Sequence, residues 1–233
     1  MGRFGGPAEG VGSKTTATDL VSDADRDAER LIRDVLVRER PDDALLAEEG
    51  TSEAGESGRR WVFDPLDGTV SYLYGYPHWC VSVALEDGEG TVAGVVYDPN
   101  REELFTAERG EGATLAGEAI RVRNAAPLER ALVATGFGYD PDRRARQADV
   151  VRDLLPRVRD IRRAGSAALD LAWLAAGRLD AYYERGLNPW DWAAGTLLVR
   201  EAGGAVEELP GEPAGLIAGP AALVAELRPL VDR

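Results

Sequence analysis

Two carboxylates lie three residues apart in the stretch WVFDPLDGTVSY, residues 61–72. Asp64 follows an aromatic and apolar run, and Asp67 stands directly before a Gly-Thr step. We interpret the run as a buried strand that ends at Asp64, followed by a fixed turn and by a helix or turn start whose backbone N–H groups can face an anion. Paired carboxylates beside free N–H groups suit a site that holds a divalent metal ion and a phosphate together. The alternative is an ordinary hairpin turn at Asp67 and Gly68, with Asp64 as a solvated neighbour.

Further acids stand at the ends of other predicted elements. Glu48 follows a short apolar strand, and Asp191 opens a helix in the second half of the chain. Asp25 lies in the acidic first turn of an N-terminal helix. An exposed acidic turn is the alternative for Glu48, and helix capping or dipole complementarity is the interpretation that we favour for Asp19 and Asp23. Glu48 and Asp191 are therefore the best candidates to complete a metal site begun by the central pair.

The lone histidine and the lone cysteine exclude several catalytic classes. A Cys-based phosphatase would need an arginine six positions after Cys80, where the chain has Glu86. A Ser-His-Asp triad would have to use His78, and no G-x-S-x-G motif accompanies it. The chain also lacks a P-loop, a G-x-G-x-x-G motif and the D-x-D motif of haloacid-dehalogenase-like phosphatases. We expect Cys80 in the core and His78 in a packing role, which leaves carboxylates and hydroxyls to carry metal-dependent chemistry.

Composition limits the possible partners. The chain has 233 residues, of which 44% are hydrophobic, and a formal net charge of −14. This charge repels nucleic acid and anionic membrane, so we expect neither as a direct partner. It also repels an anionic substrate unless metal ions reverse the sign locally. One cysteine allows no intramolecular disulfide, and neither a signal peptide nor a membrane-spanning run is apparent, so we predict a soluble cytoplasmic protein.

The elements that must position these acids divide the chain into an arm and two halves. Residues 1–18 are predicted to be a flexible arm with a mobile loop at 14–16. Residues 19–130 form an α+β half with a mostly antiparallel sheet, and 131–233 form an α/β half that completes a single catalytic unit. Predicted helices cover 19–39, 143–155, 166–176, 190–201 and 221–230. Predicted strands cover 44–47, 61–63, 80–85, 92–97, 104–107, 119–122, 131–134, 161–163 and 179–183.

Two details of this prediction can be checked against a structure. The first helix, from Asp19 to Glu39, is expected to bury a stripe that includes Ala24, Leu31 and Val35, together with Leu20 and Leu36. The Pro- and Gly-rich segment 209–220 is expected to be a connection without regular structure. The fold class that follows is α/β, with helices and sheets in alternating layers and the site between the two halves.

Four blocks of the sequence resemble the inositol monophosphatase family of Mg²⁺-dependent, lithium-sensitive sugar phosphatases. They are DLVSDAD at 19–25, AEEG at 47–50, DPLDGT at 64–69, and GSAA at 165–168 taken together with WDWAAG at 190–195. The third matches the family signature D-P-[IL]-D-G-T fully, and the last pair matches G-[ST]-A-A and W-D-x-A-A-G. The similarity runs from about residue 13 to the end and is greatest to the bacterial, actinobacterial-like inositol-1-monophosphatase branch.

The resemblance implies two to three Mg²⁺ ions per site. Asp64 would bridge two of them. Glu48 and the carbonyl of Leu66 would complete the shell of the first ion. Asp67 and Asp191 would hold the second ion.

The resemblance also implies how water and phosphate are held. Thr69, hydrogen-bonded to Asp25, and Glu48 would orient and deprotonate the attacking water. A third, weaker ion would use Glu48 and waters near the 14–16 loop. The N–H groups of Gly68 and Thr69 would cradle the phosphate. Glu184 would accept hydrogen bonds from ring hydroxyls on the sugar side. The full implied substrate-binding set is Leu66, Asp67, Gly68, Thr69, Gly165, Ser166, Ala167, Glu184 and Asp191.

The chain departs from the family pattern at a few positions. Ala47 replaces a glycine, Gly50 a serine and Ser71 an asparagine, and none of these changes removes an implied ligand. The family usually has a helix before the residue-13 region, and we expect this first N-terminal helix to be missing. By resemblance we also expect a homodimer.

The function implied is hydrolysis of inositol 1-phosphate, a small phosphorylated polyol. Within the same fold, histidinol phosphate, fructose 1,6-bisphosphate and nucleotide 3′-phosphates are alternatives. A bisphosphate or nucleotide would require extra basic groups, and the segment after Glu184 offers only Arg185. An alternative of another class is a non-catalytic, protein-binding regulator of transcription or ribosomal RNA maturation.

Overall fold

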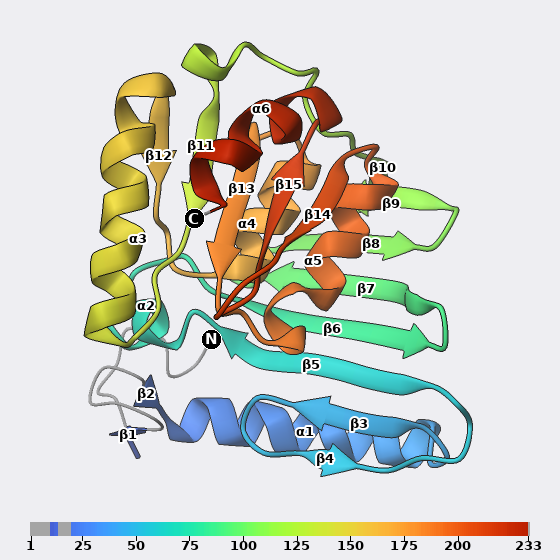
Figure 1. Cartoon of the computed structure of the whole chain (residues 1–233). Helices are drawn as coiled ribbons and strands as arrows, with labels where there is room; N and C mark the ends of the chain where they lie inside the picture. The colour runs from blue at the N-terminus through green and yellow to red at the C-terminus, as the bar shows by residue number, and fades with distance from the viewer. Residues whose placement is uncertain (1–9, 14–19, 233) are drawn as a thin grey trace.

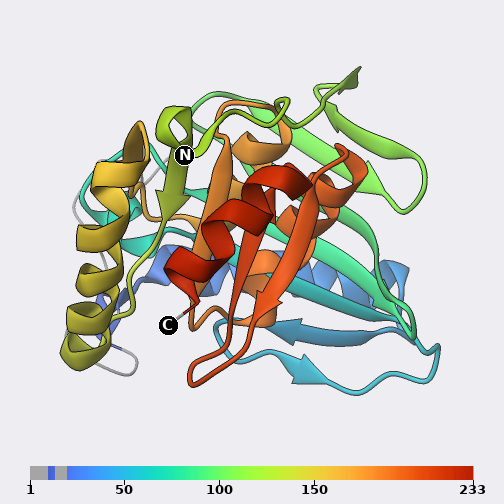
Figure 2. The ribbon, with the colours of Figure 1, turned by 45° about the horizontal axis from the view of Figure 1, so that its top comes forward.

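The fold alternates helical layers with two β-sheets. The computed structural model describes residues 10–13 and 20–232. Helices α4 (Ala167–Ala175) and α5 (Pro189–Glu201) lie between the sheets and contact strands of both. Helix α1 (Asp23–Glu39) packs on the outer face of the first sheet, and α6 (Ala221–Val231) packs on the outer face of the second, beside α3 (Pro141–Leu154) (Figures 1 and 2). The predicted α/β layered fold is confirmed.

The first sheet has eight strands in the order β10-β9-β8-β7-β6-β5-β3-β4, and only its β3–β5 pair is parallel. Its strands are β3 (Ala44–Ala47), β4 (Ser52–Glu53), β5 (Arg60–Asp67), β6 (Cys80–Asp87), β7 (Gly90–Asp98), β8 (Glu103–Glu108), β9 (Gly112–Leu115) and β10 (Glu118–Ala119). The predicted strand over 119–122 is wrong after Ala119, because β10 ends there. Strand β9 was not predicted, because its sequence GATL has only two apolar residues and lies among glycines and a threonine.

Strand β5 is longer than predicted and carries a bulge. It continues to Asp67, so neither the predicted turn after Asp64 nor the alternative hairpin at Asp67 is present. Asp64 pairs with Ser82 and Asp67 with Cys80, so β5 has one more residue than β6 across this step. Residues three apart in a regular strand face opposite sides, and one inserted residue brings both side chains to the same side. The bulge therefore turns a D-x-x-D spacing into a pair of carboxylates that face one cavity.

The second sheet has five strands in the order β12-β11-β13-β15-β14. They are β11 (Leu132–Thr135), β12 (Asp160–Arg162), β13 (Ala181–Arg185), β14 (Ala205–Leu209) and β15 (Gly215–Gly219). The expectation of an irregular connection over 209–220 is wrong, because β15 lies within it and pairs with both β13 and β14. β15 is buried between two neighbours, so its sequence GLIAG shows a short apolar run rather than the alternation of a half-exposed strand.

Helix α1 begins four residues later than predicted and buries a different face. Residues Leu20–Val21 form a short strand, β2, which pairs with β1 (Gly12–Ser13), and Ser22 caps the helix. Leu31 and Val35 are 65% and 47% exposed, so the predicted apolar stripe is wrong at these positions. The inward face instead carries Asp25 and Glu29, which hold parts of the site. Asp19 and the 14–16 loop lie outside the described residues.

The remaining elements are a short helix and two 3₁₀ turns. They are α2 (Thr69–Leu73), η1 (Leu128–Arg130) and η2 (Leu155–Arg157). Close approach of α4 and α5 depends on Gly195, where a Cβ atom would lie 2.6 Å from the Cβ of Leu171. The first turn of α4 contacts the bulge of β5 through Asp67, and α5 also packs on β5, so the acids of the two halves meet there.

Candidate active site

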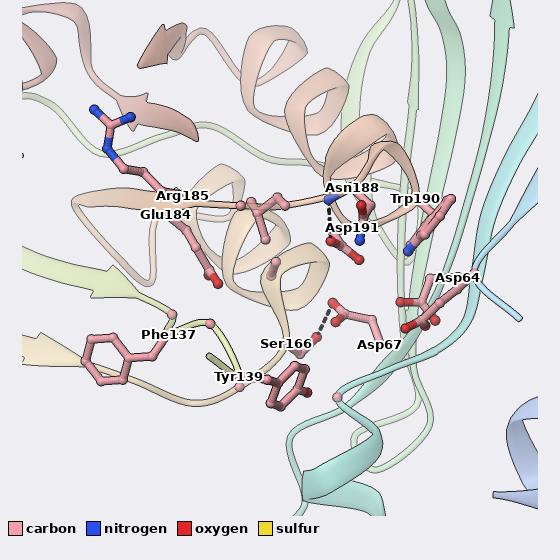
Figure 3. A pocket seen from close by; sticks show the side chains of 18 of the residues that line it. Asp64, Asp67, Phe137, Tyr139, Ser166, Glu184, Arg185, Asn188, Trp190 and Asp191 are labelled. Carbon is pink, nitrogen blue, oxygen red and sulfur yellow. Dashed lines mark hydrogen bonds between the residues drawn. The ribbon is translucent and has the colours of Figure 1, made fainter. Parts of the chain in front are cut away.

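Four carboxylates from both halves of the chain line one cavity of 980 Å³. Asp64 and Asp67 come from the bulge of β5, Glu48 from the turn after β3, and Asp191 from the first turn of α5. Figure 3 shows the side chains of Asp64, Asp67 and Asp191 near one another at one side of this pocket. A site assembled in this way exists only when the two sheets and the helices between them pack together.

Asp67 links the strand to the start of α4. Its Oδ2 accepts hydrogen bonds from the Ser166 hydroxyl and from the backbone N–H of Ala168, both at 2.7 Å. Ser166 is the N-cap of α4 and also receives the N–H of Leu169. The carboxylate therefore sits at the positive end of the helix dipole, which favours its charged form. The Asp67–Ser166 hydrogen bond thus connects a predicted metal ligand to a predicted sugar-binding residue.

The other two aspartates also have fixed orientations. Asp64 is 2% exposed, and its Oδ1 accepts the N–H of Leu66 at 2.8 Å. Asp191 closes a capping box at the start of α5, where its Oδ2 accepts the N–H of Asn188 at 2.7 Å. Each carboxylate has one oxygen fixed by a backbone N–H, and this contact restrains the orientation of the other.

A buried hydroxyl and carboxylate stand behind the pair. The Thr69 hydroxyl donates to Asp25 Oδ1 at 2.9 Å and lies 3.3 Å from the carbonyl oxygen of Leu66. Asp25 is fully buried, and its Oδ2 accepts from the N–H and the hydroxyl of Ser22 at 2.9 and 2.5 Å. Gly68 precedes Thr69 with φ +100°, in a turn where a Cβ would lie 3.0 Å from the carbonyl oxygen of His78. Glycine is required there both by φ and by space.

The turn that carries Glu48 is held by Glu29, a residue that sequence reasoning missed. Glu29 is 6% exposed on the inner face of α1. It accepts the N–H of Glu49 at 2.7 Å, the N–H of Thr51 at 3.0 Å and the hydroxyl of Thr51 at 2.7 Å. Its position four residues after Asp25, one helical turn, was the available signal, because both then face the same side.

Burial and mutual repulsion raise the pKa values of the three aspartates. Burial first, and then the charges of Glu48, Asp67 and Asp191, raise the pKa of Asp64 well above its usual range. Burial raises the pKa of Asp67 to about 7 against the opposing hydrogen bonds from Ser166 and Ala168. Burial and Asp67 likewise raise the pKa of Asp191. Such a cluster ionises fully only when positive charge enters it.

The donor atoms fit a hard divalent cation. All are oxygens, which is the ligand set that Mg²⁺ prefers. Within the part of the chain that the structure describes, no three His, Cys, Asp or Glu side chains are arranged so that they could hold a metal ion together. Mg²⁺ does not require such a cage, because it keeps several waters and is usually bound through one or two carboxylates and substrate phosphates.

The predicted sugar-side residues line the same cavity. Gly165, Ser166 and Ala167 contribute from the start of α4, and Glu184 contributes from β13. The hydroxyl of Tyr182 donates to Glu184 Oε2 at 2.6 Å, and burial raises the pKa of Glu184 to about 7. Figure 3 shows Glu184 across the pocket from Asp64.

Two of the predicted site residues do not line the cavity, and several lining residues were not predicted. Leu66 and Asp25 lie behind the wall, where they contact Thr69. Arg185 reaches the lining but turns its guanidinium away, toward Asp232 at 2.7 Å (Figure 3). The additional lining residues include Phe137, Tyr139, Arg143, Arg163 and Asp170. They come from loops and from the first turns of two helices of the second half, α3 and α4, where no motif marks them.

Comparison with known proteins identifies the family. The sequence matches the model of the inositol monophosphatase family over residues 2–230. The chain belongs to the inositol monophosphatase family. It is 44% identical over 215 residues to the inositol-1-monophosphatase SuhB of Mycobacterium tuberculosis, which covers 88% of this chain and 74% of that protein. It is 52% identical over 198 residues to the Nus factor SuhB of Xylella fastidiosa, with 84% and 71% covered.

Solved structures of the family share the fold. The extragenic suppressor protein SuhB of Bartonella henselae superposes with a TM-score of 0.90 and 42% identity, over 96% of this chain and 88% of that chain. The inositol monophosphatase of Thermotoga maritima has a TM-score of 0.88 at 34% identity, over 99% and 89%. Among the described helices, none is long and apolar enough to span a membrane.

Proposed function

We propose that this family member is a Mg²⁺-dependent phosphate monoester hydrolase whose substrate is inositol 1-phosphate. The observation that carries the proposal is the convergence of Glu48, Asp64, Asp67 and Asp191 on one cavity together with the Thr69–Asp25 pair. A buried acidic cluster of this kind is costly to the fold unless a cation balances it. The mycobacterial relative named inositol-1-monophosphatase supports the choice of substrate.

The ligand roles in the proposal follow the predicted set. Asp64, Glu48 and the carbonyl of Leu66 would hold one ion. Asp64, Asp67 and Asp191 would hold a second only after moving closer together around it, because no three carboxylates of the described residues are already arranged as a metal cage. A third, weaker ion would use Glu48. When bound, Mg²⁺ supplies Lewis-acid chemistry, because it lowers the pKa of a coordinated water and neutralises charge on phosphoryl oxygens.

Thr69 and Glu48 would position the attacking water. The Thr69 proton is committed to Asp25, so the hydroxyl oxygen offers its lone pairs to a proton of that water. Glu48 would accept the proton that the water loses on attack. The N–H groups of Gly68 and Thr69 would contact the phosphate oxygens. No histidine is required, which agrees with His78 lying 3% exposed and 3.2 Å from Asp170.

The sugar side would select a polyol. Glu184 would accept hydrogen bonds from adjacent ring hydroxyls, with the first turn of α4 beside it. A carboxylate held by Tyr182 in a buried wall is well suited to hydroxyl groups, because each accepted hydrogen bond offsets the cost of its burial.

The deciding experiment is phosphate release from a panel of monoesters, with Mg²⁺ and after chelation by EDTA. The panel would contain inositol 1-phosphate, histidinol phosphate, fructose 1,6-bisphosphate and a nucleotide 3′-phosphate. We expect turnover that requires Mg²⁺ and is greatest for inositol 1-phosphate. A different leading substrate would reassign specificity, and no metal-dependent turnover on any member would refute the enzymatic proposal.

A second candidate function is binding of a protein partner in transcription or ribosomal RNA maturation. It is favoured by the 52% identity to a relative named as a Nus factor. The net charge of −14 suits a basic protein surface better than nucleic acid. An Asp64→Asn variant would distinguish the two functions, because it should lose turnover but keep any partner binding.

We further propose a cytoplasmic homodimer, on the basis of the single cysteine and of the family resemblance. Light scattering during size-exclusion chromatography would test the assembly, and elution at the mass of one chain would contradict it.

A further inference from the structure

Arg143, in the first turn of α3, lines the active-site cavity on the side of Phe137 and Glu184. It also lines a neighbouring cavity of 400 Å³, so its side chain stands where the two cavities meet. Phe137 and Glu184 lie across the pocket from Asp64 in Figure 3. Arg143 lies next to Gly138, one residue after Phe137, and next to Gly186, two residues after Glu184. The cavity thus has Glu48, Asp64, Asp67 and Asp191 at one side, and a guanidinium together with Glu184 at another.

The backbone around Arg143 is shaped to admit its side chain. A Cβ at Gly138 would lie 2.5 Å from the Arg143 Cδ, and a Cβ at Gly186 would lie 2.5 Å from its Nη1. Any larger residue at either position would therefore displace the arginine. The loop before α3 is fixed as well, because the N–H of Gly138 donates to Gln147 Oε1 at 2.9 Å. The two glycines therefore leave room for the half-buried Arg143 side chain to reach the cavity lining.

The charge of Arg143 has no ion-pair partner among the described residues, whereas the neighbouring Arg185 pairs with Asp232. Arg185 donates to Asp232 at 2.7 Å and to the carbonyl oxygens of Pro210 and Pro213 at 2.9 and 3.1 Å. Asp140 also lines the cavity, but its Oδ1 accepts the backbone N–H of Arg143 as the helix cap. Of the two arginines that line both cavities, Arg143 is therefore the one without an acidic partner in the described part of the chain, while Arg163, which lines the active-site cavity alone, lies 5.8 Å from the centre of the Phe137 ring.

We propose that Arg143 forms an anion subsite that binds a second phosphate group of a polyol bisphosphate, away from the phosphate that is hydrolysed. The subsite rests on the proposed function, since it assumes that the first phosphate lies at the carboxylates. Guanidinium and phosphate form paired, charge-assisted hydrogen bonds in a fixed geometry. The cavity volume of 980 Å³ is at the upper end of the ~300–1,000 Å³ typical of small-molecule sites, which leaves room beyond a monophosphorylated ring.

The kinetic test compares fructose 1,6-bisphosphate with fructose 1-phosphate, which differ in the distal phosphate alone. The measured quantity is the ratio of their kcat/KM values in wild type, Arg143→Gln and the matched control Arg144→Gln. Arg144 is exposed on the same helix and does not line either cavity. We expect Arg143→Gln to lower the ratio about tenfold, as loss of one charge-assisted contact predicts, and Arg144→Gln to leave it unchanged. Arg143→Lys should retain part of the preference, because it keeps the charge without the paired geometry.

A binding test keeps the subsite separate from the catalytic proposal. Calorimetric titration of fructose 6-phosphate, which carries only the distal phosphate, in EDTA measures affinity at the subsite without metal ions and without turnover, and Arg143→Gln should bind it about tenfold more weakly than Arg144→Gln. If no ester is hydrolysed, the proposed function fails and this titration still decides the subsite. Equal affinities of the two folded variants, or equal losses for both fructose esters, would overturn the subsite and show that Arg143 only shapes the wall.

Discussion

Glu29 is predicted to control activity from outside the cavity, through the turn that carries Glu48. The perturbation is Glu29→Gln. The side chain accepts three hydrogen bonds from Glu49 and Thr51 through two carboxylate oxygens. An amide keeps one acceptor oxygen and turns an NH₂ group toward at least one N–H donor. The substitution therefore removes at least one bond and weakens the others from charge-assisted to neutral.

The magnitude follows from these contacts. A hydrogen bond to a charged group contributes about 1.5–3 kcal/mol and a neutral one about 0.5–1.5 kcal/mol. Because Glu49 and Thr51 are only half-buried, water replaces part of the loss. We expect the free energy of unfolding to fall by about 2–3 kcal/mol. For a chain of this size, each kcal/mol corresponds to about 2–4 °C in Tm.

The effect on catalysis should exceed the effect on the folded population. A displacement of about 1 Å at a reacting group costs up to about 100-fold in rate, so loosening the Glu48 turn should lower kcat at least tenfold at 25 °C. Calorimetry would give Tm, and phosphate release would give kcat at a temperature where the variant is fully folded. Glu39→Gln is the matched control, because Glu39 lies on the same helix with a 62% exposed side chain. An unchanged kcat with an unchanged Tm would refute the role assigned to Glu29, and a lowered Tm alone would show that the turn is structural.

Three other predictions concern single residues. Asp64→Asn should abolish nearly all turnover while the far-ultraviolet circular dichroism stays native, and substantial remaining kcat would contradict its bridging role. Glu184→Gln should change the ranking of substrates. Because burial raises the pKa of Glu184 to about 7, ionisation of this carboxyl lowers the stability of the wild type as pH rises through that value. The variant should therefore gain stability relative to wild type between pH 5 and 8, and a constant difference in unfolding free energy would argue against this. Gly68→Ala should lower stability by about 1–3 kcal/mol more than Gly110→Ala, since both have positive φ but only the Gly68 Cβ would meet other atoms, and equal losses would refute the packing argument.

The sequence was most informative where local chemistry and the motif agreed. The acids predicted for the site do line one cavity, apart from Asp25, and the elements that carry them are present. The short apolar strand before Glu48 and the helix that opens near Asp191 had clear boundaries, because a turn or a capping residue marked each one. Their roles at the metal remain predictions.

Other features could not be predicted because they depend on contacts between distant segments. The bulge that turns Asp64 and Asp67 to one side requires the pairing of β5 with β6. On α1, apolar Leu31 and Val35 are exposed while Glu29 is buried, since the loop beneath the helix presents N–H donors rather than apolar side chains. Arg143 carried no motif, and its place at the cavity is set by α3 and by two distant glycines.

The strand β15 escaped prediction for a related reason. Its flanking glycines and prolines indicated a loop, whereas pairing with β13 and β14 on both sides stabilises a short buried strand. Intrinsic propensity is a weak guide in such a strand, because burial and neighbouring side chains decide its structure.

The central claim is that the carboxylate cluster works by binding Mg²⁺ for phosphate ester hydrolysis. The most direct test is the rate of phosphate release from inositol 1-phosphate by the wild-type protein as a function of Mg²⁺ concentration, starting from protein treated with EDTA. The account predicts no turnover without the metal and a saturable rise as Mg²⁺ is added. A folded protein that releases no phosphate at any Mg²⁺ concentration, or one that turns over equally well in EDTA, would contradict it.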